Sequence, residues 1–78
     1  QVTFYPNPVS EQFFVNVFDV DFQDVYLEIY DVLGRRIEQV QLTQPEQAID
    51  VGQLNAGWYT FRVIERKSIV GKGKFVKK

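Results

Sequence analysis

The sequence of 78 residues contains no cysteine, histidine or methionine. These residues supply the usual ligands of transition metals, the most common general base and the strongest natural nucleophile. Their absence excludes such metal sites and Cys/His or Ser/His catalysis, so we expect no enzyme activity and no cofactor. Without cysteine no disulfide can form, and core packing and turn geometry must hold the fold together.

Long hydrophobic runs are also missing. Apolar residues make up 45% of the chain, but they occur in short segments. These segments fall far below the roughly 20 residues of a membrane-spanning helix. The chain begins with Gln rather than Met and has no charged-then-apolar leader, so we expect it to be part of a longer polypeptide. Its length suits one small core, and we predict a single domain over residues 1–78.

The apolar residues that are present recur at every second position, and no segment sustains a helical stripe. Turn residues separate the runs at intervals of roughly 8 to 12 residues, which is typical of an immunoglobulin-like sandwich. The pattern therefore predicts an all-β fold, a seven-stranded antiparallel immunoglobulin-like β-sandwich. The strands are expected near residues 2–5, 13–18, 25–30, 37–42, 49–51, 59–65 and 69–76.

A hairpin is predicted over residues 25–42, with its turn at Asp31-Val32-Leu33-Gly34. Asp favours the first position of a type I turn, and Gly accepts the positive φ that follows it. On the returning strand the apolar phase shifts after Ile37, which indicates one extra residue in a β-bulge.

A second local signal is Tyr59, which enters a strand directly after the turn that contains Gly57. A tyrosine at this place can direct its hydroxyl back to upstream backbone, as in the tyrosine corner of sandwich folds. We therefore expect residues 51–59 to cross from one sheet to the other.

The charges divide sharply along the chain. Residues 62–78 hold seven Lys and Arg against one carboxylate, whereas residues 1–61 hold two Arg against nine carboxylates. Lysines on a terminal strand either protect a sheet edge from unwanted pairing or form a basic recognition surface. An edge strand at the free end of the chain could also be peeled off or paired with a receptor strand at low cost. The acidic body and the sequence pI near 5.2 argue against nucleic acid as a partner.

Two further groups of residues have alternative interpretations. Asp19, Asp21 and Asp24 lack the Gly and the terminal Glu of a calcium loop, and a solvated loop is the favoured interpretation. Exposed aromatic residues on a sheet can stack on sugar rings, or they can pack against neighbouring strands or a flanking domain. The aromatic residues predicted to face away from the core are Tyr26, Tyr30 and Trp58. The domain is too small to enclose a cleft for a small-molecule substrate.

Four short motifs occur in order along nearly the whole chain. They are Tyr5-Pro6-Asn7-Pro8, Ile29-Tyr30-Asp31-Val32-Leu33-Gly34-Arg35, Leu54-Asn55-Ala56-Gly57-Trp58-Tyr59 and Lys74-Phe75-Val76-Lys77-Lys78. Together they resemble the type A C-terminal sorting domain of the type IX secretion system of Bacteroidetes. Trp58 departs from the family pattern, in which a smaller aliphatic residue is common at that place.

The resemblance implies a secretion signal that follows an N-terminal passenger domain. A separate signal peptide would carry such a protein to the periplasm, and the sorting domain would be recognised by the outer-membrane translocon. A sortase-like cysteine peptidase commonly removes domains of this kind, often joining the passenger to an anionic lipopolysaccharide. The expected location is the periplasm and outer membrane in transit, and then the cell surface or the medium.

The resemblance also assigns roles to residues. It implies a structural role for Tyr5, Pro6, Asn7, Pro8, Gly34, Leu54, Gly57 and Tyr59. It implies recognition by the translocon or the sortase-like peptidase for Lys72, Lys74, Phe75, Val76, Lys77 and Lys78. The alternative hypothesis is an immunoglobulin-like adhesion or carbohydrate-binding module of a surface enzyme, which would keep the fold without the export role.

Overall fold

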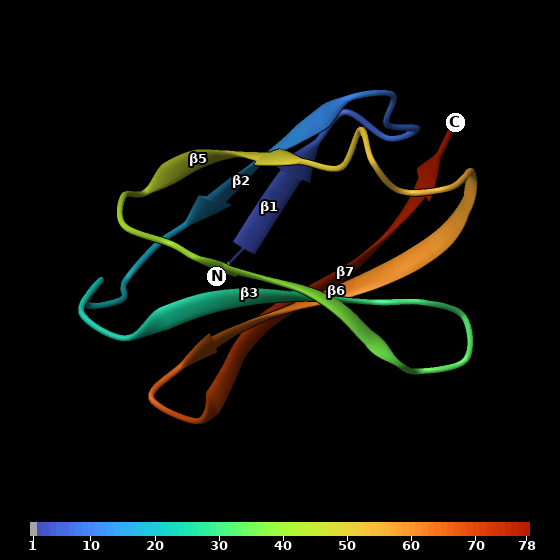
Figure 1. Ribbon diagram of the computed structural model, residues 1–78. Helices are drawn as coiled ribbons and strands as arrows, with labels where there is room; N and C mark the ends of the chain where they lie inside the picture. The colour runs from blue at the N-terminus through green and yellow to red at the C-terminus, as the bar shows by residue number, and fades with distance from the viewer. Residues whose placement is uncertain (1) are drawn as a thin grey trace.

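Seven β-strands form two antiparallel sheets in the computed structural model, which describes residues 2–78 (Figure 1). The first sheet has the order β1-β2-β5 and the second has the order β4-β3-β6-β7. The all-β sandwich predicted from the sequence is confirmed. The strands are β1 (Val2–Tyr5), β2 (Gln12–Val17), β3 (Val25–Tyr30), β4 (Arg36–Gln41), β5 (Glu46–Asp50), β6 (Gly57–Glu65) and β7 (Ser68–Lys77). Within residues 2–78 there is no helix that could cross a membrane.

The core lies between the two sheets, on the faces that the period-two pattern marks as apolar. Its centre is a group of four phenylalanine rings with centroid separations of 4.9 to 6.5 Å. Phe4 and Phe13 come from the first sheet, whereas Phe61 and Phe75 come from the second. Aromatic pairs at such distances add attraction beyond the burial of their area. The aromatic group therefore joins the two layers directly.

The β3–β4 hairpin has the predicted turn and the predicted bulge. The Gly34 N–H donates to the Asp31 carbonyl at 3.0 Å, and Gly34 has a φ of 83°. The pairing moves from Ile29 opposite Glu38 to Tyr30 opposite Arg36, so Ile37 is the extra residue. The bulge turns Ile37 toward solvent, which explains the shifted apolar phase.

The tyrosine corner is also confirmed. The Tyr59 hydroxyl donates to the Asn55 carbonyl at 2.7 Å. Gly57, with a φ of 149°, begins β6 two residues earlier. Because β5 belongs to the first sheet and β6 to the second, the segment between them crosses the sandwich as expected.

The segment between β1 and β2 reaches the edge of the second sheet, although both strands belong to the first. Residues 6–8 contain two prolines, whose preceding peptide bonds are both cis, and they end the pairing of β1 with β2. Val9 then lies beside Lys77 in a parallel bridge at the edge of the second sheet. Figure 1 shows the C-terminus close to the loop that connects β1 and β2. The first and last motifs of the sequence are thus neighbours in space.

Candidate functional site

The candidate recognition residues lie on and directly after β7, an edge strand of the four-stranded sheet. They divide by the two-residue period of the strand. Phe75 is fully buried in the core and Lys77 is 8% exposed, and the Lys77 Nζ donates to the Lys78 carbonyl at 2.9 Å. Lys72 and Lys74 are exposed on the outer face of the sheet, Val76 is half-buried there, and Lys78 is exposed at the end. The structure thus brings only part of the predicted set to one surface.

Two glycines on the inner face of β7 were not recognised in the sequence as important. A Cβ at Gly71 would lie 2.1 Å from the Val2 side chain. A Cβ at Gly73 would lie 2.6 to 2.7 Å from the rings of Phe4 and Phe61. Such distances are far inside van der Waals contact, so these positions require glycine for β1 to pack over β7. The alternation Gly71-Lys72-Gly73-Lys74 was the signal that could have shown this.

The sequence placed residues 74–78 on an edge strand at the free end of the chain, and β7 is an edge strand. Residues 7 and 9 nevertheless form hydrogen bonds along its open side. The Asn7 Nδ2 donates to the Lys74 carbonyl at 3.3 Å, and the Val76 N–H donates to Asn7 Oδ1 at 3.0 Å. The Val9 N–H donates to the Val76 carbonyl and the Lys78 N–H donates to the Val9 carbonyl, both at 2.8 Å. Asn7 and Val9 therefore take the place of a neighbouring strand along this edge. A receptor strand could pair there only by displacing them.

On the outer face, polar side chains of three strands form a network around Glu28. The Tyr30 hydroxyl donates to Glu28 Oε1 at 2.5 Å, and Arg36 Nη1 lies 3.0 Å from Glu28 Oε2. These two interactions hold the pKa of the Glu28 carboxyl below its usual range. Arg62 donates to the Tyr30 hydroxyl, and its guanidinium lies 4.4 Å from the centre of the Tyr30 ring. The network thus covers one face of Tyr30.

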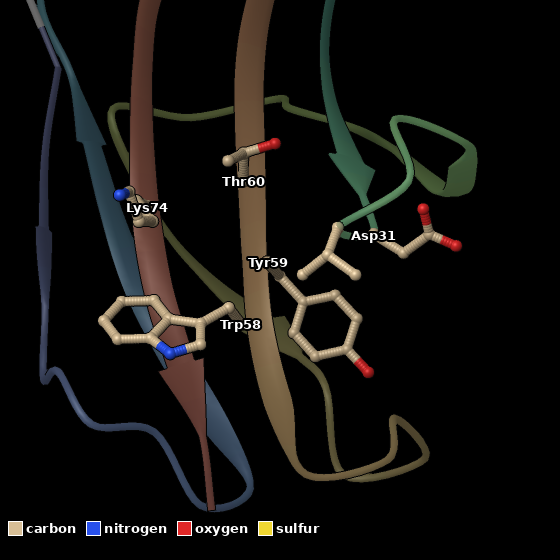
Figure 2. Close-up of a pocket in the computed structure, with 6 residues that line it drawn as sticks. Asp31, Trp58, Tyr59, Thr60 and Lys74 are labelled. Carbon is tan, nitrogen blue, oxygen red and sulfur yellow. The ribbon is translucent and has the colours of Figure 1, made fainter.

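Trp58 is 55% exposed, and it stands at one end of a groove over β6 and β7 (Figure 2). One hollow of about 350 Å³ lies between Trp58, Val32 and Lys74. A second hollow of about 430 Å³ lies beside it and is lined by Arg62, Lys72 and Lys74. Both hollows are lined by Thr60 and Lys74, so they adjoin at these two residues. We call the two adjoining hollows the outer groove.

The family model of the secretion system C-terminal sorting domain matches residues 3–78. The chain belongs to this family. The resemblance drawn from the four motifs, to a sorting domain of the type IX secretion system, is therefore confirmed. A search among curated proteins found no matching relative.

In this sorting domain the four motifs have separate structural places. The first, at residues 5–8, covers the edge of β7, and the second forms the β3–β4 turn. The third contains the tyrosine corner, while the last fills the core with Phe75. The packing role of Asn7 was hidden because its partners lie 67 and 69 residues away. Motif spacing indicates contacts between residues that are near in the sequence, but it does not indicate contacts between residues this far apart in the chain.

The three aromatic residues of the sugar-binding hypothesis do not form one platform in the sorting domain. Tyr26 pairs opposite Ile64, six residues from Trp58 along β6, which corresponds to about 20 Å. Tyr30 is covered by Arg62 on one face. Trp58 is the exposed ring among them.

Among the acidic residues of the β2–β3 loop, Asp21 contacts the β6–β7 turn. Arg66 Nη2 lies 3.0 Å from Asp21 Oδ2, and the Asp21 N–H donates to Glu65 at 3.0 Å. Across residues 2–78 no group of three acidic side chains is placed to hold a metal ion. The loop thus packs against the β6–β7 turn of the sorting domain through an exposed ion pair.

Proposed function

We propose that residues 1–78 act as a C-terminal secretion signal that directs an N-terminal passenger through the type IX outer-membrane translocon. The observation that carries the proposal is the family match over residues 3–78, which includes all four motifs. The passenger is then exported to the cell surface or the medium. The domain itself is a ligand of the export machinery and has no catalytic role.

A secretion assay in a host that possesses the type IX system tests this function. Residues 1–78 are fused to the C-terminus of an inert reporter that carries a signal peptide. We expect the fusion to cross the outer membrane and the reporter alone to remain in the periplasm. A fusion that is folded but retained in the periplasm would contradict the proposal.

The exposed lysines Lys72, Lys74 and Lys78 are proposed as the recognition residues that touch the machinery. Phe75, Val76 and Lys77 are proposed to support recognition by fixing the shape of the strand, because their side chains are buried or half-buried. Deleting residues 74–78 would remove Phe75 from the core, so lost export of that deletion would not separate recognition from folding.

A triple variant separates the two roles. Lys72→Gln, Lys74→Gln and Lys78→Gln remove three exposed charges, and each change should alter stability by no more than about 0.5 kcal/mol. The matched control removes three positive charges elsewhere, through Arg35→Gln, Arg66→Gln and Lys67→Gln. Export of the control but not of the triple variant, at similar melting temperatures, supports the assignment. Equal export of both would place recognition elsewhere on the sandwich.

A sortase-like cysteine peptidase is proposed to remove the domain after export. The exported reporter should then be smaller by about 9.1 kDa, the mass of the domain, in a strain with the peptidase than in a strain without it. Gel electrophoresis and mass spectrometry measure this difference. A reporter of the same size in both strains would show that this domain is not removed.

A further inference from the structure

The outer groove differs from the rest of the molecule in the charges that it presents. Arg62, Lys72 and Lys74 line it, although the chain as a whole has a net charge of -1. The carboxylate that lines it is Asp31, which accepts hydrogen bonds from the Arg35 and Leu33 N–H groups and pairs with the Arg35 side chain at 2.8 Å. Its charge is thus compensated locally, and the groove is positive.

The lysines of the groove take no part in the ion pairs of the described residues, whereas three of the four arginines do. The three ion pairs within residues 2–78 use Arg35, Arg36 and Arg66. Lys72 and Lys74 are absent from these pairs, and the Lys74 Nζ lies 5.5 Å from the centre of the Trp58 ring. An ammonium over an aromatic face stays accessible from the other side. The fold therefore leaves Lys72 and Lys74 outside these ion pairs, with Lys74 beside the exposed Trp58 ring.

One end of the groove is apolar. Trp58 is 55% exposed and Val32, at the tip of the β3–β4 turn, is 75% exposed. Both line the first hollow, where a partner's apolar side chain would be removed from water. The groove thus has an apolar end and a cationic end, joined at Thr60 and Lys74.

The strand register gives the spacing of these features. Trp58 pairs opposite Val76, Thr60 opposite Lys74, and Arg62 opposite Lys72. Trp58 and Arg62 are four residues apart, which corresponds to about 13 Å along a strand. An extended peptide over β6 would direct every second side chain into the groove, so three of its side chains would meet Trp58, Lys74 and the Arg62–Lys72 pair in turn.

We infer that the outer groove binds an extended acidic segment of a partner protein, with the pattern apolar-x-acidic-x-acidic. The apolar side chain packs on Trp58 and Val32, and the two carboxylates pair with Lys74 and with Lys72 and Arg62. The inference rests on the proposed function for the identity of the partner, a component of the export machinery. Binding itself is a property of the domain alone. An acidic polysaccharide fits less well, because a single exposed ring stands at one end of the groove.

The probe is the peptide acetyl-Phe-Ser-Glu-Ser-Glu-amide, added to the purified domain at low salt. Trp58 is the sole tryptophan of the chain, so its fluorescence reports directly on the groove. We expect a saturable change that weakens as salt is added, because the ion pairs are exposed. Acetyl-Phe-Ser-Lys-Ser-Lys-amide, the charge-reversed peptide, should give no saturable change.

Variants then locate the binding site. Lys72→Gln together with Lys74→Gln should weaken binding about tenfold, as expected for two exposed ion pairs. Arg66→Gln together with Lys67→Gln removes the same charge outside the groove and should change binding less than about twofold. Trp58→Leu should weaken binding several-fold. Because this variant lacks the tryptophan signal, its binding is measured by the fluorescence anisotropy of a fluorescein-labelled peptide. Equal effects of the two double variants would overturn the inference.

Two outcomes separate this inference from the proposed function. If Trp58 responds to polygalacturonate and not to the acidic peptide, the groove is a polysaccharide site and the inference is wrong, even where the reporter fusion is exported. If the peptide binds as expected and the folded fusion stays in the periplasm, the acidic-segment site stands and the export function fails.

Discussion

The two faces of β7 differ in how their side chains are held. On the inner face, Gly73, Phe75 and Lys77 are fixed by packing or by a hydrogen bond. On the outer face, Lys72 and Lys74 are exposed and take no part in the ion pairs of the described chain. Exposed lysines and packed residues therefore alternate along β7. Substitutions can change one face of the strand at a time and so test whether the two faces differ.

The largest effect is expected from Phe75→Ala. Phe75 is fully buried against Phe13, Tyr59 and Phe61. Truncating a buried Phe leaves a cavity and should lower the free energy of unfolding by about 3 to 5 kcal/mol. On the other face Lys74→Ala should change it by about 0.5 kcal/mol or less. Urea titrations of both variants measure the difference, and similar losses would show that the two faces are not distinct.

A smaller effect on the inner face is expected from Gly73→Ala. The added Cβ would overlap the rings of Phe4 and Phe61, and overpacking of this kind should cost about 1 to 3 kcal/mol. The control is Gly52→Ala, where the nearest atom is the end of the flexible Glu11 side chain. Thermal unfolding followed by circular dichroism compares the two. A Gly73→Ala variant as stable as the control would mean that β1 does not pack closely over β7.

The edge between the two faces is tested by Asn7→Ala. This change removes the side-chain hydrogen bonds to the Lys74 carbonyl and the Val76 N–H. Because the site is exposed, water replaces part of the loss, and a cost of about 1 kcal/mol is expected. Hydrogen exchange of the Val76 amide should also become faster. Ser10→Ala is the control, and unchanged exchange in Asn7→Ala would contradict the proposed pairing.

The smallest effect is expected in the pH dependence of the unfolding free energy, to which Glu28 on the outer face contributes. The pKa of Glu28 is lowered by the Tyr30 hydroxyl and by Arg36, so its folded carboxylate is favoured. Stability from this group is present above the ordinary Glu pKa of 4.5, which applies to the unfolded chain, and is lost as the pH falls through the lower pKa of the folded state. Glu28→Gln should therefore reduce the drop in unfolding free energy between about pH 7 and pH 3.

Asp31 also has a lowered pKa, because the Arg35 N–H and side chain bind its carboxylate. The Asp31→Asn variant should reduce the same acid-dependent drop independently of Glu28. If neither variant changes the pH dependence of the unfolding free energy, these two carboxylates do not stabilise the fold, and the prediction is wrong.

Much of the fold could be predicted from local sequence. Period-two patterns located the strands to within a few residues, and turn chemistry identified the Gly34 turn, the Ile37 bulge and the Tyr59 corner. These features depend on neighbours in the chain, so composition and spacing carry enough information. The four motifs likewise predicted the family.

The arrangement of the ending could not be predicted in the same way. The partners of Asn7 and Val9 on β7 lie more than sixty residues away along the chain, and a local sequence pattern cannot predict such a pairing. Lys77 looked like one more exposed charge, although strand alternation places it beside Phe75 on the inner face. The outer groove depends on three strands lying side by side, which a single sequence does not reveal.

The pairing of Asn7 and Val9 with the last strand also bears on how the polypeptide is made. A ribosome synthesises β7 after every other strand of the domain, and the first motif has no edge to cover until residues 74–78 exist. A copy that stops short of them leaves β6 without a complete neighbour and the phenylalanine group without Phe75. Folding of the sorting domain therefore requires residues 74–78, because the first motif can cover the edge of β7 only after that strand is complete.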